Sequence, residues 1–288
     1  MNYCKQNTRT CREVIGLFPA GGRASRIAPL PCSKELYPVG FHPVGRDRSL
    51  RPKVISHYLL EKMRLANIRK AYIILREGKW DIPAYFGNGK MLDMHLAYLM
   101  MDLPFGVPYT LDQAYYFVED AIIALGFPDT IFQPDDVFVK LLAKQTESDA
   151  DLVLGLFPAL QPHKTDMVEL DDMGRISSIT IKPGNTKLLY AWETAVWTPV
   201  FTRFMHDYVL DRQVLCDENK IENNLDKQKE LHVGDIIHAA IQNDMKIDAV
   251  LFKEGSCLDI GTPDDLLKAV QITNQVSSDD QLLSYNAI

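Results

Sequence analysis

The stretch Val14-Ile-Gly-Leu-Phe-Pro-Ala-Gly-Gly-Arg-Ala-Ser-Arg26 decides the expected fold, because an apolar run ends there in a loop rich in glycine and arginine. Its first five residues, Val14 to Phe18, form a short uninterrupted apolar segment, which is typical of a strand buried inside a parallel sheet. Open α/β sheets bind their ligands beyond the carboxyl ends of such strands. The sequence therefore predicts a ligand-binding loop immediately after the first strand.

The segments that follow alternate between helix and strand, which predicts a three-layer α/β sheet. Apolar spacing indicates a helix over Val54–Ala66 and a strand over Lys70–Leu75. The same reasoning predicts helices over residues 111–125, 137–146, 199–209 and 233–243, and strands over residues 130–133, 151–156, 167–170, 176–181, 189–196 and 246–252. The polar segment Asp211–Glu230 is expected to be a solvated loop, and Thr262-Pro-Asp-Asp265 to begin the last helix. The predicted fold class is α/β, with a Rossmann-like, three-layer mixed sheet.

The composition excludes several classes of protein. The chain has 288 residues, with 31 Lys and Arg against 38 Asp and Glu, and its net charge of −7 argues against broad contact with nucleic acid or anionic lipid. Five scattered cysteines without a CxxC pair indicate neither a disulfide framework nor a zinc site. The N-terminus lacks the apolar core of a signal peptide, and no segment approaches the roughly 18 apolar residues of a membrane span. We therefore expect a cytoplasmic protein with small-molecule partners, no nucleic-acid or membrane partner, and a composition compatible with a homo-oligomer.

The loop after the first strand carries groups that bind phosphate. The backbone amides of Gly21 and Gly22 can approach phosphate oxygens closely because no side chain intervenes, and Arg23, Arg26 and Lys34 supply positive charge. The alternative is an ordinary glycine turn flanked by solvated basic residues. The chain contains no GxxxxGK[ST] motif and no GxGxxG after the first strand, which disfavours a P-loop nucleotidase and a dinucleotide-binding dehydrogenase.

At this loop the chain resembles the sugar-1-phosphate nucleotidyltransferase family, whose glycine-rich loop is followed by a lysine before an apolar Leu-Pro-Val. The matching residues are Ala20-Gly-Gly-Arg-Ala-Ser-Arg-Ile27 and Ser33-Lys-Glu-Leu-Tyr-Pro-Val39. Five further segments match the family in order between about Val14 and Val270: Ile82-Pro-Ala-Tyr-Phe-Gly-Asn-Gly89, Thr110-Leu-Asp-Gln-Ala114, Gln133-Pro-Asp-Asp136, Ile181-Lys-Pro183 and Leu258-Asp-Ile-Gly-Thr262. The chain departs from the pattern at Ala24, Ser25, Ile181 and Cys257, where the family has glycine, threonine, glutamate and often tryptophan.

The resemblance implies a sheet of the nucleotide-diphospho-sugar transferase type and a Mg²⁺-dependent transfer of a nucleoside monophosphate. The donor would be a nucleoside triphosphate, with a pyrimidine preferred, and the acceptor a sugar 1-phosphate or an analogous phosphate or phosphonate. Charge neutralisation and in-line positioning dominate such a reaction, so no nucleophilic side chain is needed. It also implies one domain over residues 14–273, with a sheet insertion around 157–232 that binds the acceptor, an N-terminal flexible arm over 1–13 and a C-terminal tail over 274–288.

The resemblance also implies a role for each of a set of residues. Catalysis would use Arg26, Lys34 and Asp135, and Mg²⁺ would be held by Asp135 and Asp259. The nucleotide would be bound by Ala20, Gly21, Gly22, Arg23, Ala24, Ser25, Gln113 and Pro134, and the acceptor phosphate by Lys182. Ala195 stands where the family has a glycine that contacts the sugar, and because Ile181 replaces the family's glutamate, Glu193 or Trp192 is expected to shape the acceptor pocket instead.

Other interpretations of these residues stay open at this point. Asp135 and Asp136 can be first-turn acids of the helix that starts at Val137, and Asp259 can be a turn acid before the last helix. Lys182 can be a solvated strand end. The departures at Ala24, Pro134 and Ile181 also fit a sensor that binds nucleotide without turnover, and an unrelated NAD-binding α/β protein is a third hypothesis.

Overall fold

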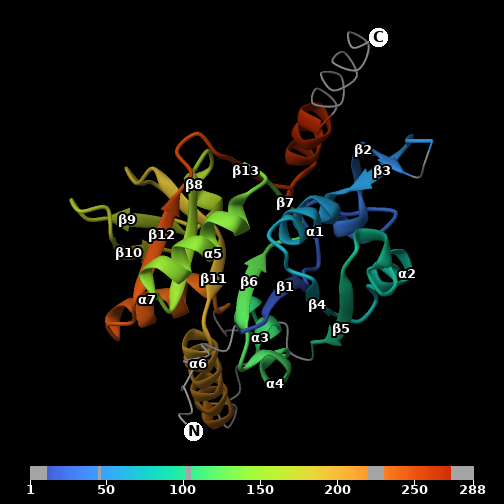
Figure 1. Cartoon of the computed structure of the whole chain (residues 1–288). Coiled ribbons are helices and arrows are strands. Elements are labelled where there is room, and N and C mark those ends of the chain that lie inside the picture. The colour runs from blue at the N-terminus through green and yellow to red at the C-terminus, as the bar shows by residue number, and fades with distance from the viewer. Residues whose placement is uncertain (1–11, 45–46, 102–104, 220–229, 274–288) are drawn as a thin grey trace, which may run out of the picture.

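The computed structural model describes residues 12–44, 47–101, 105–219 and 230–273, and its centre is one large mixed sheet (Figure 1). Its seven main strands, from one edge to the other, are β12 (Ile247–Leu251), β8 (Leu152–Pro158), β11 (Tyr190–Trp197), β6 (Ile122–Gly126), β1 (Val14–Ala20), β4 (Lys70–Leu75) and β5 (His95–Met100). Strands β9 (Met167–Leu170) and β10 (Ile176–Thr180) extend the sheet beside the start of β11. The predicted α/β class and mixed sheet are confirmed.

The directions of the strands bring particular ends together. Strands β6, β1, β4 and β5 are parallel, so the loops after β1, β4 and β6 leave the same edge of the sheet. Strand β11 runs antiparallel to β6 and pairs Thr194 with Gly126. The start of β11 therefore lies at the edge where β1 and β6 end.

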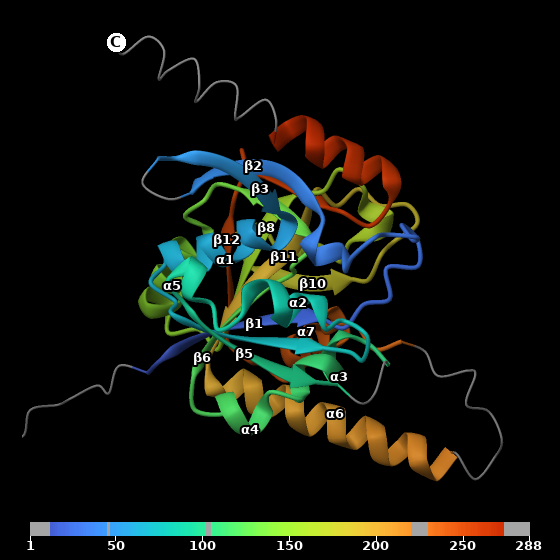
Figure 2. The same cartoon turned by 90° about the vertical axis from the view of Figure 1, so that its right-hand side faces the viewer.

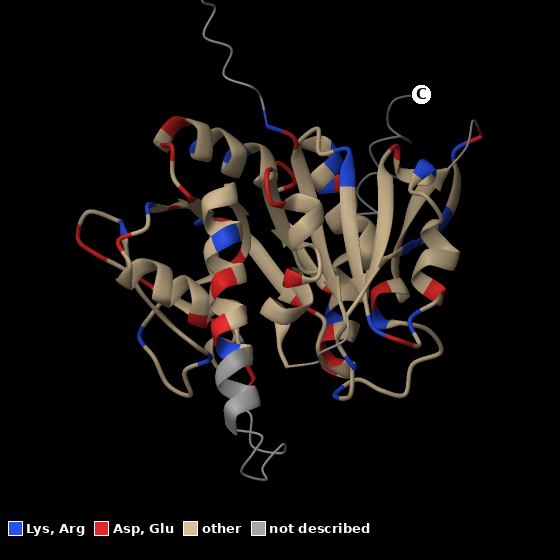
Figure 3. Cartoon of the chain, turned by 90° about the horizontal axis from the view of Figure 1, so that it is seen from below, with Lys and Arg blue, Asp and Glu red and all other residues tan. Residues whose placement is uncertain are grey.

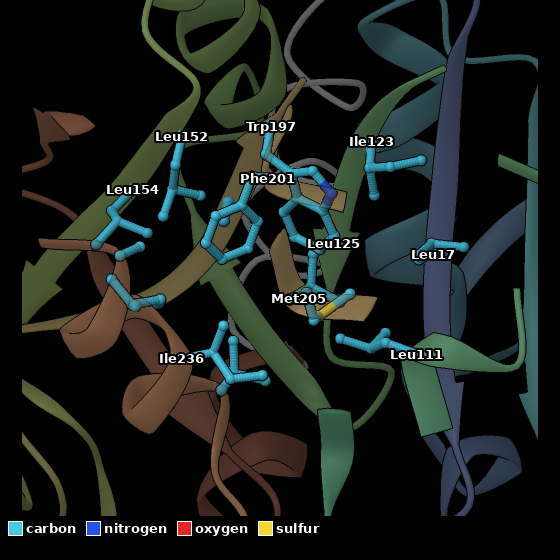
Figure 4. Packing of buried hydrophobic residues seen from close by; sticks show 14 of the residues in the cluster. Leu17, Leu111, Ile123, Leu125, Leu152, Leu154, Trp197, Phe201, Met205 and Ile236 are labelled. Carbon is cyan, nitrogen blue, oxygen red and sulfur yellow. The ribbon is translucent and has the colours of Figure 1, made fainter. Parts of the chain in front are cut away.

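Helices cover both faces of the sheet, because the buried strands are apolar on both sides. One face is covered by α1 (Ile55–Leu65), α2 (Asp81–Phe86) and α5 (Val137–Ser148). The other is covered by α3 (Val107–Asp112), α4 (Tyr115–Val118), α6 (Pro199–Asn219) and α7 (Val233–Gln242). Figure 4 shows this second face, where Leu17, Ile123 and Leu125 of the sheet pack in one cluster with Phe201 and Met205 of α6.

Two short pairs of strands lie outside the main sheet. Strand β7 (Thr130–Gln133) pairs with β13 (Ser256–Asp259), and β2 (Pro38–Val44) forms a hairpin with β3 (Ser49–Val54). The hairpin lies beside the helical residues 263–273 in both views (Figures 1 and 2). Three short 3₁₀ helices complete the described elements: η1 (Lys34–Leu36), η2 (Lys90–Leu92) and η3 (Pro162–Lys164).

The predicted helix over residues 111–125 is wrong, and this error matters most for the site. The segment contains the end of α3, the short helix α4 and then the central strand β6. Ile123, Ala124 and Leu125 are fully buried between β1 and β11. The polar pair Glu119-Asp120 forms a turn that separates α4 from this strand, and this interruption of the apolar pattern is the signal that the predicted helix overlooks.

Two further features differ from the expectations. Helix α6 continues to Asn219, so the predicted loop over 211–230 is helical in its first part, and residues 220–229 lie outside the described residues. Strands β2, β3, β5 and β13 were not predicted. The division into an arm, a domain over 14–273 and a tail stays a prediction, and residues 1–11 and 274–288 lie outside the described residues.

In the described part of the chain, no helix has the length and apolarity that a membrane crossing requires.

Candidate active site

The loop after β1, residues 21–33, is called the glycine-rich loop below. A side chain at Gly21 would contact the sulfur of Met101, so the Met101 side chain would have to move to admit one. Ala24 has a φ of +53°, a left-handed conformation that costs a residue with a side chain about 1 kcal/mol. Its carbonyl oxygen accepts hydrogen bonds from the amides of Ile27 and Ala28. The loop is therefore a tight turn with a backbone conformation that glycine would adopt more easily.

Lys34 follows the glycine-rich loop and forms an ion pair with Asp129, the first acid after β6. Burial alone lowers the pKa of Lys34, but the carboxylates of Asp129 and Asp259 outweigh it and raise the pKa above its usual value. The two segments meet because β1 and β6 are parallel neighbours. A charged ammonium group is thus fixed beside two carboxylates at the carboxyl edge of the sheet.

Asp259 lies at the end of β13, opposite Thr130 at the start of β7, and so next to Asp129. Burial, followed by the negative charge of Asp129, raises the pKa of Asp259 to about 6, although Lys34 and Arg26 oppose the rise. The Arg26 guanidinium lies close by, since a Cβ placed on Gly261 would be 3.0 Å from its Nη2 and 3.1 Å from Oδ2 of Asp259. Two carboxylates and two cations from three separate segments therefore converge: the stretch after β1, the loop after β6 and the end of β13.

Asp135 and Pro134 do not lie with this group. The register of β7 against β13 pairs Thr130 with Asp259 and Gln133 with Ser256, so β7 carries the chain about 10 Å away before Asp135 is reached. There Asp135 forms an ion pair with Lys62 of α1. The structure thus corrects the expected metal pair: Asp259 faces Asp129, and Asp135 and Pro134 lie beyond the other end of the strand.

A cavity of about 200 Å³ opens next to Asp129 and Asp259 and is called the Lys182 cavity. Lys182 lies after β10, with its Nζ 3.5 Å from Nδ1 of His232 at the start of α7, and its backbone has a φ of +40°. Strained residues of this kind cluster at binding sites. The lining also includes Glu193, Lys164 and Asp166, so the cavity offers both cations and hydrogen-bond acceptors.

Glu193 reaches the Lys182 cavity because the strand is irregular at that residue. The pairing of β11 with β8 shifts between Trp192 and Thr194, and such a bulge turns a side chain away from its regular direction. Burial, and after it the charge of Asp259, raises the pKa of Glu193 to about 8, while a hydrogen bond with the Cys257 thiol opposes the rise. A carboxyl group that is hard to ionise thus lies beside the Asp129–Asp259 pair.

Ala195 does not contribute to this cavity, in contrast to the expectation. It is 1% exposed and lies in the core, where β11 pairs it with Leu125 of β6 and Leu154 of β8. One residue, Thr194, separates Ala195 from Glu193, and the register shift lies before Thr194, so Ala195 keeps the regular direction of its strand. The backbone of β11 is therefore close to the cavity, while the methyl group of Ala195 is directed into packed side chains.

The glycine-rich loop also borders a second, basic cavity of about 460 Å³, which is called the Arg76 cavity. It is lined by Arg23 and Lys34 and by Arg76 and Lys79, which follow β4. Asp81 fixes the end of the loop, since it accepts hydrogen bonds of 2.6 Å from both the amide and the hydroxyl of Ser33. Arg76 thus reinforces the positive charge of the loop, whereas the charge of buried Lys79 is compensated by its ion pair with Glu35 at 2.5 Å.

Gln113 lies at the end of α3, where its side-chain amide donates to the Tyr109 carbonyl at 3.4 Å. The residue of α3 that approaches the glycine-rich loop is Thr110, whose hydroxyl would be 3.6 Å from a Cβ on Gly21. Helix α3 is therefore adjacent to the loop, and the role of Gln113 stays a prediction.

Sequence reasoning missed Asp129, and with it Asp166, His232, Arg76 and Lys79. Two of these had a usable signal. Asp129 is the first acid after β6 and Arg76 directly follows β4, which are the positions where a parallel sheet presents side chains to a ligand.

The charged positions of both signs are otherwise interspersed over the face of the chain drawn in Figure 3, which fits local rather than broad electrostatics.

Comparison with known proteins gives one match to a protein family. A sequence model described as "Nucleotidyl transferase" matches residues 15–276. Among curated proteins, a glucose-1-phosphate thymidylyltransferase from Streptomyces griseus is 26% identical over 175 residues. That alignment covers 59% of this chain and 45% of the relative, so the chain matches less than half of the relative's length.

Solved structures resemble the whole described fold. A Bacillus anthracis structure, assigned as a glucose-1-phosphate thymidylyltransferase and solved with sucrose, has a TM-score of 0.71 at 20% identity, covering 90% of this chain and 95% of its own. A UDP-glucose pyrophosphorylase solved with UDP-glucose has a TM-score of 0.70 at 16% identity, with 90% and 98% covered. At these identities the likeness is one of fold.

Proposed function

Because the chain belongs to the nucleotidyl transferase family, we propose that it transfers a nucleoside monophosphate from a nucleoside triphosphate to a phosphorylated small molecule and releases pyrophosphate. The observation that carries the proposal is the convergence of Asp129, Asp259, Lys34 and Arg26 between the glycine-rich loop and the Lys182 cavity. Such a reaction joins two polyanions, so a site with fixed cations and a place for a divalent ion is what it requires.

The triphosphate would occupy the side of the glycine-rich loop. Its amides and the side chains of Arg23, Arg26 and Lys34 offer donors to phosphate oxygens, and Arg76 extends the positive charge where pyrophosphate would leave. Ala20, Gly22, Ala24 and Ser25 would contribute backbone contacts, and Gln113 a contact to the base, for which a pyrimidine remains our preference. These cations hold the phosphates in line, which supplies most of the rate in phosphoryl transfer.

A divalent cation fits Asp129 and Asp259. Both are carboxylates, the oxygen ligands that Mg²⁺ prefers, and burial, followed by the like charge of Asp129, raises the pKa of Asp259. When bound there, Mg²⁺ would neutralise charge on the phosphate oxygens. Asp135, in its ion pair with Lys62, is outside this proposal.

The acceptor would occupy the Lys182 cavity. Lys182, with His232 beside it, would bind the acceptor phosphate, and Glu193 and Asp166 would accept hydrogen bonds from hydroxyl groups. An oxygen of the acceptor phosphate then attacks the α-phosphorus, the bond from that phosphorus to the bridging oxygen breaks, and pyrophosphate leaves with the electron pair. The lysine positions the attacking oxygen, and no protein nucleophile takes part.

The test is a matrix of nucleoside triphosphates against sugar phosphates and phosphonates, with Mg²⁺ and a pyrophosphate readout. We expect release with at least one pair, and a Lys182→Met variant that raises KM for the acceptor about tenfold while the KM for the nucleotide changes little. Tight nucleotide binding without release of pyrophosphate for any pair would contradict the proposal and favour a sensor.

A further inference from the structure

A second cluster of metal-binding residues lies where the β2–β3 hairpin meets α1. His42 lies on β2, and His57 and Glu61 lie one turn apart on α1, so both side chains share one face of the helix. One ligand atom from each of the three residues lies within 4.8 Å of the others. None of the three lines the Lys182 cavity or the Arg76 cavity, so the cluster is separate from the proposed active site.

His57 is the residue that needs an explanation. It is 1% exposed, and neither ring nitrogen has a hydrogen-bond partner among the described residues. The rings around it are His42 at 5.1 Å, Phe86 at 5.3 Å and Tyr85 at 5.7 Å between centroids. Buried polar groups without partners are rare because each costs about 1–3 kcal/mol. An imidazole in this state is expected to have a ligand.

The ligand atoms of the cluster are available for a metal ion. Both ring nitrogens of His57 lack a partner among the described residues, and neutral imidazole is a good ligand for transition metals. Glu61 is half-exposed and pairs through Oε2 with Lys53 at 2.5 Å, which leaves Oε1 on the same carboxylate.

We propose that His42, His57 and Glu61 form a binding site for Zn²⁺ that connects the β2–β3 hairpin to α1. Two imidazoles and one carboxylate are a known Zn²⁺ ligand set, whereas Mg²⁺ prefers oxygen ligands alone. In a tetrahedral site with bonds of about 2.0–2.1 Å the ligand atoms are about 3.3 Å apart, so rotation of the half-exposed His42 and Glu61 side chains has to bring them closer. Water would complete the coordination from the open side.

The position of the hairpin gives the site a structural consequence. The carbonyl oxygen of Val39 on β2 accepts a hydrogen bond from the Thr273 hydroxyl, and Gly40 lies against the Tyr58 hydroxyl of α1. The hairpin therefore lies between α1 and the helical residues 263–273 (Figure 2). A bound ion would fix the hairpin on α1 and stabilise the folded chain.

The test is a titration of the full chain with Zn²⁺ and with Co²⁺ in the presence of millimolar Mg²⁺, which occupies oxygen-ligand sites. We expect one Zn²⁺ per chain, a rise in Tm, and an absorption band of four-coordinate Co²⁺. His42→Ala and Glu61→Gln, both at half-buried positions, should weaken Zn²⁺ binding at least tenfold, while His95→Ala, at an exposed histidine, should bind as the wild type does. An Asp129→Asn variant should retain the ion.

A further variant separates a metal site from an ordinary packing role. Lys53→Met removes the cation that competes for Glu61 and should tighten Zn²⁺ binding several-fold. The proposal is overturned if no Zn²⁺ binds with Mg²⁺ present, or if His42→Ala and Glu61→Gln bind Zn²⁺ as tightly as the wild type.

Discussion

Strand β7 has an aspartate beyond each of its ends, and the two have opposite surroundings. Asp129, before the strand, is half-buried, pairs with Lys34 and faces the like charge of Asp259. Asp135, after the strand, is 67% exposed and pairs with Lys62, whose side chain is 4% exposed. The first carboxylate lies beside a second carboxylate and a cavity, and the second compensates a buried cation. Two similar carboxylate–lysine pairs therefore have different surroundings, and we expect the first to matter for binding and the second for stability.

The largest effect that distinguishes the two ends is expected in catalysis. Asp129→Asn removes a preorganised charge at the proposed reaction centre and should lower kcat by about 10²–10³-fold. Asp135→Asn should leave kcat within about threefold, because this residue lies away from both cavities. Pyrophosphate release at saturating substrate measures both. Equal losses of kcat in the two variants would contradict this distinction and indicate that Asp135 takes part in catalysis.

The same comparison can be made with Lys34 and Lys62, the ion-pair partners of Asp129 and Asp135. Lys34→Met should lower kcat by about 10²-fold, because it removes a cation that lies beside both carboxylates. Lys62→Met serves as the matched control and should change kcat little. Circular dichroism and Tm of both variants check that the fold is retained, and a Lys34→Met enzyme with normal kcat would contradict the proposed role.

For the free energy of unfolding, we expect larger effects at the Asp135–Lys62 pair than at the Asp129–Lys34 pair. Asp135→Asn leaves Lys62 buried without its partner and should lower the free energy of unfolding by about 1–2 kcal/mol, a modest value since water reaches the exposed carboxylate. Lys62→Met should be neutral or stabilising, because desolvating the ammonium group lowers its pKa and costs free energy. In the Lys62→Met background, Asp135→Asn should therefore have almost no effect. Urea unfolding of the four proteins measures the coupling, and additive losses would exclude it.

The smallest effect is expected at Asp265, which supports the segment after Asp259. It is 1% exposed, accepts a hydrogen bond of 2.6 Å from Thr262 and pairs with Lys164 at 3.0 Å. Burial raises its pKa, but the Thr262 and Lys164 contacts prevail and lower it overall. The unfolded chain then binds more protons at low pH, so this contribution is present above a pH of about 4 and is lost as the pH falls through the folded-state pKa.

Asp265→Asn should consequently lower the free energy of unfolding by about 1 kcal/mol at pH 7, as the loss of a helix cap does. The difference from the wild type should vanish near pH 3. Urea unfolding of both proteins between pH 3 and 7 measures this, and a difference that stays constant with pH would contradict the assignment.

Part of the site was predictable from the sequence. The apolar run before Gly21 indicated a buried strand with a binding loop after it, and Lys34, Lys182 and Glu193 do lie around one region. Asp135 is expected from the sequence because Gln133-Pro-Asp-Asp136 follows the predicted strand over 130–133, where the family has Leu-Gly-Asp. The predicted helix over 111–125 leaves β6, which ends at Gly126 before Asp129, unrecognised. Ala195 was assigned by position along a strand, although only a bulge decides which of its residues reaches the cavity.

The sequence by itself determined the alternation of strand and helix, the glycine-rich loop and the family, because these depend on local hydrophobic periods and on residues close together in the chain. Only the tertiary structure decided which carboxylates meet. Asp129 and Asp259 are 130 positions apart in sequence, and the pairing of β7 with β13 brings one together with the other and leaves Asp135 outside. A sheet register is a property of two strands at once, so no single stretch of the chain contains it.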